Sequence, residues 1–291
     1  MKISDIIKQK NITISCEIFP PKTDAALENI DALLAQTAAL KPDFISVTYG
    51  AGGSTSKRTA QLTARLQSEY KATALAHLTC VGASYGDIDA AAHEYMQNGI
   101  YNILALRGDK PAGAAEMPEG DCKYACQLIE HLRAIDGGDK LCIGAACYPE
   151  GHIECANRAS DMHFLKEKVS AGVDFLTTQM FFDNDVLYRF LYRVLANGID
   201  VPVVAGIMPV INAKQIHRAC QLSGTELPSR LRGIADRFAD SPAAMRQAGI
   251  AYATEQIIDL IAHGVNNIHI YTMNKPDIAA KIMENISDIT A

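Results

Sequence analysis

The chain has 291 residues, 48% of them hydrophobic, which is enough for a large core in one or two domains. Its net charge is −6 and it carries no long basic run, so nucleic acid is not an expected partner. Apolar runs fall short of the ~20 residues that span a bilayer, and the first ten residues lack the apolar core of a signal peptide. We therefore expect a soluble, cytoplasmic protein that does not enter a membrane.

Eight cysteines are scattered along the chain, several of them in apolar runs. The nearest pair, Cys122 and Cys126, is four residues apart, which differs from the Cys-x-x-Cys spacing of redox and zinc sites. This distribution predicts small buried thiols in a reducing compartment, and no metal site.

Short apolar runs alternate with longer segments from one end of the chain to the other. The runs are rich in Ile, Val, Leu and Thr and show little strict alternation, as expected for strands that are buried on both faces. In chain order they cover residues 12–19, 43–49, 72–80, 101–107, 141–148, 174–181, 201–208 and 266–272.

The segments between the runs have helical spacing. Apolar residues recur on one helix face at two places, namely Leu27, Ile30 and Leu34, and Ile278, Ile282 and Ile286. Asp24 and Ser160 are expected N-caps. Eight strand–helix units predict a single-domain (β/α)₈ TIM barrel over residues 1–291. A doubly wound open sheet is the alternative, but the nearest approach to Gly-x-Gly-x-x-Gly, "GAGGST" at 50–55, breaks at Thr55.

Polar residues stand at the C-terminal ends of seven of the eight runs. They are Glu17, Thr48, His77, Arg107 with Asp109, Tyr148 with His152, Gln179 and Tyr271. The seventh run ends in the apolar "GIMP". Barrel active sites lie where these strand ends meet. Strands often end in polar residues because the loops that follow are exposed to solvent. A single residue such as His77 is therefore better explained as structural. The convergence of the whole set on one rim is what predicts a site.

Several segments, in order and at strand ends, are similar to one known family. They are "SCEIFPPKT" (15–23), "DFISVTYGAGGSTSKRT" (43–59), "AHLTC" (76–80), "NILALRGDKP" (102–111), "AACYPEGH" (145–152), "DFLTTQMFFD" (174–183), "GIMPV" (206–210) and "YTMNK" (271–275). On these motifs the chain resembles the methylenetetrahydrofolate reductases over essentially its whole length. It looks like the short bacterial form, so we expect no regulatory domain that binds S-adenosylmethionine.

The resemblance implies FAD held noncovalently at the C-terminal end of the barrel, without a Rossmann fingerprint. The residues implied to contact FAD are Thr48, His77, Arg107, Gly108, Asp109, Ala125, Tyr148, His152, Asp161 and Lys168. Arg107 and Lys168 suit the pyrophosphate charge, and Gly108 permits close approach of the backbone. Asp161 and Lys168 are seven residues apart, so one helix face can present both, although an ordinary solvated face has the same spacing.

The implied reaction reduces 5,10-methylenetetrahydrofolate to 5-methyltetrahydrofolate in one-carbon metabolism and methionine biosynthesis. NADH or NADPH first reduces the flavin and leaves, and the folate then binds at the same face, in ping-pong order. Glu17 matches the general acid, a role that desolvation by its apolar neighbours would favour. Its alternative is a structural glutamate that pairs with a cation of the barrel.

Further roles follow from the resemblance. Asp109 would bind the pterin and stabilise a cationic iminium, Gln179 would contact folate and NADH, and Lys275 would meet the glutamate tail of the folate. Ala213 stands where bacterial relatives have a phenylalanine that packs against the substrates. A homo-oligomer is also implied. The rival hypotheses are a barrel flavoenzyme with another substrate, such as a proline dehydrogenase-like protein, and a non-catalytic protein that binds folate or flavin.

Overall fold

A closed ring of eight parallel strands forms the centre of the molecule. The computed structural model describes residues 1–291 except 22–28, 50–55, 111–112 and 114. Each strand pairs with the next, and β1 pairs with β8 to close the barrel, which confirms the (β/α)₈ prediction over the open sheet. The strands are β1 (Thr13–Ile18), β2 (Phe44–Val47), β3 (Ala74–Thr79), β4 (Asn102–Leu106), β5 (Cys142–Cys147), β6 (Phe175–Thr178), β7 (Val203–Ile207) and β8 (Asn267–Ile270).

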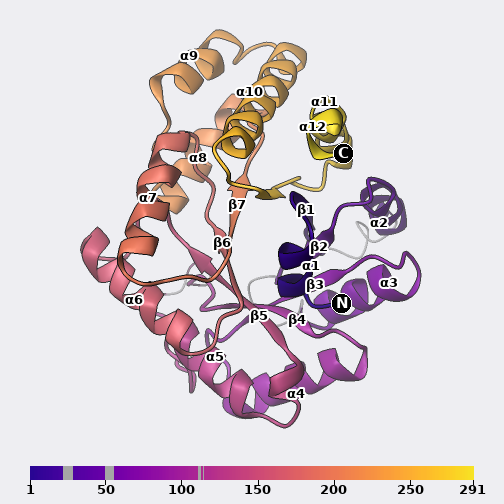
Figure 1. Ribbon diagram of the computed structural model, residues 1–291, viewed down its shortest axis with the longest axis vertical. Helices are drawn as coiled ribbons and strands as arrows, with labels where there is room; N and C mark the ends of the chain where they lie inside the picture. Colours follow the sequence, from indigo (N-terminus) through magenta and orange to yellow (C-terminus); the bar gives the residue numbers. More distant parts are fainter. Residues whose placement is uncertain (22–28, 50–55, 111–112, 114) are drawn as a thin grey trace.

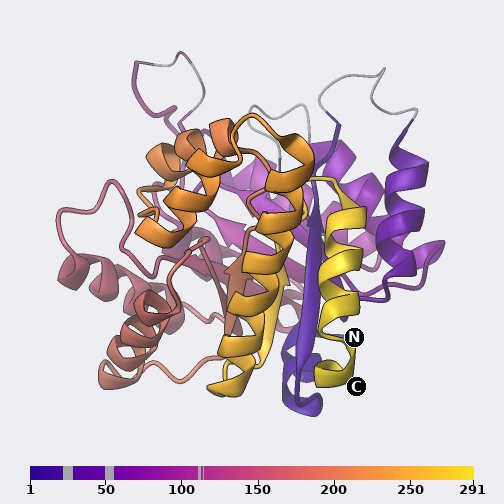
Figure 2. The ribbon, with the colours of Figure 1, turned by 90° about the horizontal axis from the view of Figure 1, so that it is seen from above.

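Helices surround the strands (Figure 1). In the described part of the chain they are α1 (Ile3–Gln9), α2 (Ile30–Ala39), α3 (Ser56–Ser68), α4 (Tyr85–Gln97), α5 (Ala125–Ala134), the 3₁₀ turn η2 (Gly138–Lys140), α6 (Arg158–Ser170), α7 (Asn184–Ala196), α8 (Ala213–Ser223), α9 (Ser229–Arg237), α10 (Pro242–Ala262), α11 (Pro276–Asn285) and α12 (Ser287–Thr290). None of the described helices is both long and apolar enough to cross a membrane. The two chain ends lie at the same end of the barrel (Figure 2).

The strands are buried along nearly their whole length, as their continuous apolar runs predicted. Each strand is shorter than its run, because apolar residues also continue into the loops. After β6, for example, Phe181 and Phe182 lie outside the strand and are 0% and 2% exposed. All eight cysteines are free thiols and five are buried, which confirms the expectation for most of them.

The helix predictions were correct at α11 and wrong at the start of α6. Ile278 and Ile282 are buried on the inner face of α11. Asn157, not Ser160, caps α6, because the Asn157 side chain accepts a 2.9 Å hydrogen bond from the Ser160 backbone N–H. Ser160 is the third residue of the helix, and its backbone N–H is the group that the Asn157 side chain bonds. The predicted cap Asp24, and Leu27, fall outside the described residues.

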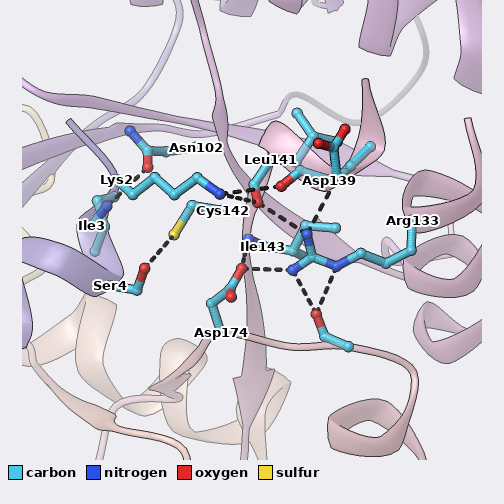
Figure 3. A network of polar contacts seen from close by, with 12 residues as sticks. Lys2, Ile3, Ser4, Asn102, Arg133, Asp139, Leu141, Cys142, Ile143 and Asp174 are labelled. Atoms are coloured by element: carbon cyan, nitrogen blue, oxygen red, sulfur yellow. Dashed lines mark hydrogen bonds and ion pairs between the residues drawn. The ribbon is translucent and has the colours of Figure 1, made fainter. Parts of the chain in front are cut away.

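The N-terminal helix α1 is fastened to the strand starts at one end of the barrel (Figure 3). The Ile3 backbone N–H donates to Asn102 Oδ1 at 3.0 Å, and Asn102 Nδ2 donates to the carbonyls of Met1 and Ala74. Lys2 Nζ donates to the Asp139 carbonyl at 3.2 Å. These contacts hold α1 against this end, so the opposite end is the one that carries the candidate site.

Arg133, from α5, makes the densest set of polar contacts at the same end (Figure 3). Its guanidinium donates to the carbonyls of Gly138, Gly172 and Leu141. It also donates to Asp174 Oδ2 at 2.6 Å, and that oxygen accepts the Ile143 backbone N–H. One side chain thus satisfies backbone carbonyls that loops would otherwise leave unpaired.

Candidate active site

Two adjoining cavities, of about 970 and 960 Å³, lie at the C-terminal ends of the strands. They share a wall, because residues from three strand ends line both. The shared residues are Val81, Leu106, Arg107, Pro118, Ala146, Tyr148 and His152. Two neighbouring cavities of this size suit a long cofactor together with a substrate.

The first cavity brings together residues from the ends of β2, β3, β4, β6 and β8. Of the predicted set, Thr48, His77, Gly108, Asp109, Gln179 and Tyr271 line it, besides the shared residues. His77 Nε2 is buried and has no hydrogen-bond partner. Burial, with a smaller contribution from nearby His269, lowers the pKa of His77 to about 3, so the ring is neutral. Its Nε2 is therefore available to a ligand.

Arg107 lies where the two cavities meet. Its Nη1 donates a 2.5 Å hydrogen bond to Glu154 Oε2, and this pairing raises the pKa of Arg107 and lowers that of Glu154. Gly108 follows with a φ of +92°. A Cβ on Gly108 would stand 2.6 Å from Val81 Cγ1. The Gly108 backbone therefore lies closer to Val81 than a residue with a side chain could.

The second cavity is walled by α5 and α6. Ala125, Asp161 and Lys168 all line it, so one face of α6 presents both charged residues, as predicted. Lys168 Nζ donates to the Ala146 carbonyl at 2.5 Å and lies 5.7 Å from the centre of the Tyr148 ring. Burial lowers the pKa of Lys168 and raises that of Asp161, while the two opposite charges partly offset both shifts.

Tyr148 and His152 complete the wall that the two cavities share. Their rings meet edge to face at 4.6 Å. Burial raises the pKa of Tyr148, and the Asp109 charge adds to the effect. The pKa of His152 is lowered, first by burial and then by Arg107. Both side chains are thus neutral groups that can exchange hydrogen bonds with a ligand near pH 7.

Glu17 lies inside the barrel at the same end, beside the first cavity and not in its lining. It is 4% exposed, and its backbone carbonyl accepts a 2.6 Å hydrogen bond from Thr272 Oγ1. The Asn274 amide fastens the following loop, since its Oδ1 accepts from Phe19 N–H at 2.7 Å and its Nδ2 donates to Phe19 O at 2.9 Å. Glu17 and Asp109 thus belong to the same end of the barrel.

The charged partner that Glu17 has in the described residues is a histidine. Within the described ranges, neither a lysine nor an arginine lies within 4.0 Å of its carboxylate, and the group that does is His269, with Nε2 3.9 Å from Oε2. The alternative of a structural glutamate that pairs with a cation of the barrel therefore stays open, with His269 on β8 as the candidate partner. The sequence analysis missed His269 and its neighbour Ser15. Ser15 could have been found, because it is two residues before Glu17 and so lies on the same face of the strand.

The remaining predicted residues are spread more widely. Gln179 Oε1 accepts the Met180 backbone N–H at 2.9 Å, which leaves the amide NH₂ group to meet a ligand. Lys275 is exposed, in the loop between β8 and α11. Ala213 begins α8, is 9% exposed and packs in a small apolar cluster with Met180 and Ile216.

Two aromatic rings at the rim of the second cavity were also missed. Tyr124 and Phe164 are each about half exposed, and their rings are nearly parallel, with centres 6.4 Å apart. Glu154, the partner of Arg107, was missed as well. These residues come from separate loops and helices, and each one alone resembles an ordinary surface residue in the sequence.

A closed (β/α)₈ barrel with large cavities at the carboxyl ends of its strands, lined by apolar walls and a few charged and polar side chains, is typical of barrel enzymes. A model of the family "Methylenetetrahydrofolate reductase" matches residues 2–287. The chain belongs to the methylenetetrahydrofolate reductase family, whose members are oxidoreductases.

Named relatives are found in plants and bacteria. The chain is 36% identical over 296 residues to methylenetetrahydrofolate reductase (NADH) 1 of Arabidopsis thaliana, with 98% of this chain and 50% of the relative covered. It is 33% identical over 278 residues to 5,10-methylenetetrahydrofolate reductase of Escherichia coli K12, with 96% of this chain and 92% of the relative covered. The chain thus spans about half the length of the plant relatives and nearly all of the bacterial one.

Among solved structures, an uncharacterized Clostridium thermocellum protein described as binding two copies of 5-methyl-5,6,7,8-tetrahydrofolic acid has the same fold. The TM-score is 0.65 at 16% identity, and the alignment covers 98% of this chain and 97% of the other. At this identity the likeness concerns the fold alone.

Proposed function

We propose that the protein reduces 5,10-methylenetetrahydrofolate to 5-methyltetrahydrofolate, with noncovalent FAD and with NADH or NADPH as the electron donor. The observation that carries the proposal is the pair of adjoining cavities in which Arg107, Asp161 and Lys168 accompany the neutral groups of His77 and Tyr148. The family match adds the reaction. The product would serve one-carbon metabolism and methionine biosynthesis in the cytoplasm.

The residues present fit FAD on four observations. His77 Nε2 is a buried polar atom without a partner at the cavity wall. Gly108 lines the first cavity at a φ of +92°, where a Cβ would stand 2.6 Å from Val81 Cγ1, so the lining there is bare backbone. Arg107 and Lys168 supply two positive charges, one at the junction of the cavities and one in the second cavity, which suits a diphosphate between two ring systems. The rims formed by Tyr124 and Phe164 suit a flat ring at the outer end.

The chemistry that bound FAD supplies is the acceptance of a hydride from NADH or NADPH and its transfer to the one-carbon unit of the folate. The chain provides the proton and the orientation. Glu17 would give its proton to the folate nitrogen that departs as the methylene bridge opens. Asp109, exposed at the cavity edge, would hold the pterin and stabilise the cation that forms. Gln179 would donate through its NH₂ group, and Lys275 would meet the glutamate tail.

The direct test is the colour of the purified protein under anaerobic conditions. We expect a yellow protein that NADH or NADPH bleaches and that 5,10-methylenetetrahydrofolate returns to yellow, with release of 5-methyltetrahydrofolate. Bleaching without reoxidation by the folate would favour another flavoenzyme substrate. A colourless protein that neither binds FAD nor turns over would overturn the proposal.

The role of Glu17 is tested by separating the two half-reactions. Glu17→Gln removes the acidic proton at nearly constant volume, so it should leave flavin reduction within about 2-fold of wild type and slow folate reduction by at least about 100-fold. An equal fall in both half-reactions would make Glu17 a structural residue. Gel filtration with light scattering tests the homo-oligomer that we also propose.

A further inference from the structure

A third, smaller cavity lies beside the turn that joins Tyr148 to His152. Its volume is about 170 Å³, and it is enclosed by the loop between β5 and α6, by α7 and by the loop between α8 and α9. Charged side chains of both signs line it. They are the arginines Arg158, Arg189 and Arg193 and the carboxylates Glu150, Asp183 and Glu226. The proposed reaction uses none of these six residues.

The opposite charges of this lining do not pair with one another. Among the described residues, no nitrogen of the three arginines lies within 4.0 Å of a side-chain oxygen of the three carboxylates, and the nearest acid to Arg189 is Asp185, outside the lining. The arginines instead contact the backbone. Arg158 Nε donates to the Glu150 carbonyl at 3.3 Å, and Arg193 Nη2 donates to the Pro149 carbonyl at 3.0 Å. Space therefore remains between the two sets of charges.

Like charges lie together, so the cavity has two poles. Burial lowers the pKa of Arg193, and the positive charges of the other two arginines lower it further. Burial raises the pKa of Glu150, and the negative charges of the other two carboxylates add to that effect. Arg158 is close enough to both residues to influence each. The three arginines thus form a basic pole and the three carboxylates an acidic pole, with Arg158 between them.

Arg193 carries the free donor of the basic pole. Its Nε is buried and has no hydrogen-bond partner in the described part of the chain. The bond from Nη2 to Pro149 and the Phe190 ring, 5.8 Å from Cζ, fix the guanidinium on its other side. A guanidinium held in place with an unused N–H is suited to bind a carboxylate.

The acidic pole supplies the acceptors. Asp183 Oδ1 accepts the Asp185 backbone N–H at 3.0 Å, and Glu150 Oε2 accepts the Glu226 backbone N–H at 2.9 Å. Within the described ranges, the Glu226 carboxylate itself has no hydrogen bond and no ion pair, and the residue is exposed. Each carboxylate therefore has at least one oxygen lone pair left for an ammonium group.

We propose that this cavity binds a free α-amino acid with an apolar side chain. The ligand carboxylate would bind the basic pole, its ammonium group the acidic pole, and its side chain would lie against Pro149, Val186 and Pro228. The cavity has room for roughly ten water molecules, which suits a ligand of this size. A purely anionic ligand would meet three carboxylates and a purely cationic one three guanidinium groups, so a ligand with both charges is favoured.

Binding is tested on the purified protein with saturating FAD, by calorimetry with L-leucine, L-valine and L-methionine as probes. We expect at least one dissociation constant of about 1 mM or tighter. Isocaproate, which is leucine without the ammonium group, and isoamylamine, which is leucine without the carboxylate, should bind at least about 10-fold more weakly than leucine. The proposal fails if none of the three amino acids binds at about 10 mM, or if isocaproate binds as tightly as leucine. Reductase activity does not enter this measurement.

Variants locate the ligand in this cavity. Arg193→Gln should weaken leucine binding at least about 10-fold. Because this change also removes the bond to Pro149, Val186→Phe is the second variant, which fills the cavity without removing a charge or a backbone contact and should also weaken binding at least about 10-fold. Leucine binding that both variants leave unchanged overturns the proposal.

The acidic pole is tested by Glu226→Gln. It should weaken leucine about 3- to 10-fold and leave isocaproate bound at least as well as before, because only leucine has an ammonium group to lose its partner. Asp236→Asn is the matched control, since Asp236 is an exposed carboxylate on α9 outside the lining, and it should change neither affinity. An equal loss of leucine binding in both variants would reduce the effect to net charge and contradict the site.

Discussion

Arg107 donates a 2.5 Å hydrogen bond to Glu154 at the junction of the two cavities. The arginine is the residue best suited to an anionic group there, and in this structure a carboxylate of the chain itself faces it. Glu154 is largely exposed, with 56% of its side chain accessible, so the pair can part without much loss. If FAD binds as proposed, the carboxylate would compete with its diphosphate for the same guanidinium.

The first prediction is that Glu154→Gln binds FAD more tightly. Removing the competing charge should lower the dissociation constant of FAD about 2- to 5-fold, the range of an exposed ion pair. The measurement is a fluorescence titration of apoprotein with FAD. Glu119→Gln removes an equal charge from the lining of the same cavity and should have less effect. Weaker FAD binding in Glu154→Gln would instead make Glu154 part of the binding site.

The second prediction concerns the close approach at Gly108. Gly108→Ala should weaken FAD binding at least about 10-fold and lower the free energy of unfolding by about 1–3 kcal/mol, because φ is +92° and the new methyl group would meet Val81. Gly113→Ala is the control, since its φ is +85° but nothing lies within 4 Å of its Cβ position. If Gly108→Ala and Gly113→Ala weakened FAD binding and stability equally, the cause would be the positive φ and not the contact with Val81.

The third prediction is a pH dependence of stability caused by His77. Its pKa falls from 6.5 in the unfolded chain to about 3 in the folded protein, so the unfolded state takes up the proton first. The associated stability is complete above about pH 6.5 and is lost as the pH falls toward 3. Between pH 7 and pH 5, wild-type apoprotein should lose about 2 kcal/mol more than His77→Gln. The measurement is urea unfolding of both proteins at pH 7 and pH 5. An equal loss of unfolding free energy in wild type and in His77→Gln would contradict the prediction.

The fourth prediction concerns Arg133 at the opposite end of the barrel. Arg133→Lys keeps the charge but cannot serve three carbonyls and Asp174 together, so the free energy of unfolding should fall by about 2–4 kcal/mol. Folate reduction should be unaffected at temperatures where the protein is folded. Arg65→Lys, in an exposed pair with Glu69, should change stability by less than about 0.5 kcal/mol. Urea unfolding of both variants decides between them.

The fold was predictable because every strand is buried on both faces and so appears as an apolar run of its own. The count of eight, with helical segments between them, leaves few arrangements besides a closed barrel. Boundaries were less predictable. The loop after β6 is as apolar as the strand, because Phe181 and Phe182 pack in the core, and Asn157 takes the capping role that Ser160 could also have served.

The site was predictable where residues end strands, as at His77 and Arg107, since a barrel gathers all such ends on one rim. It was not predictable where function depends on contacts between loops. The partner of Arg107 is 47 residues away in the chain, at Glu154. The partner of Glu17 is His269, which reads in the sequence as an ordinary interior residue of the last strand.

The pairing of β1 with β8 has a consequence for how the protein is made. Ser15 and His269 are separated by 254 residues, so the Glu17 carboxyl group and the ring beside it come together only when β1 pairs with β8. A nascent chain on the ribosome exposes Glu17 early and must wait for almost all of its length before that carboxyl group acquires its neighbour. The contact between Glu17 and His269 therefore forms only when β1 pairs with β8, so it marks the completion of the ring of strands.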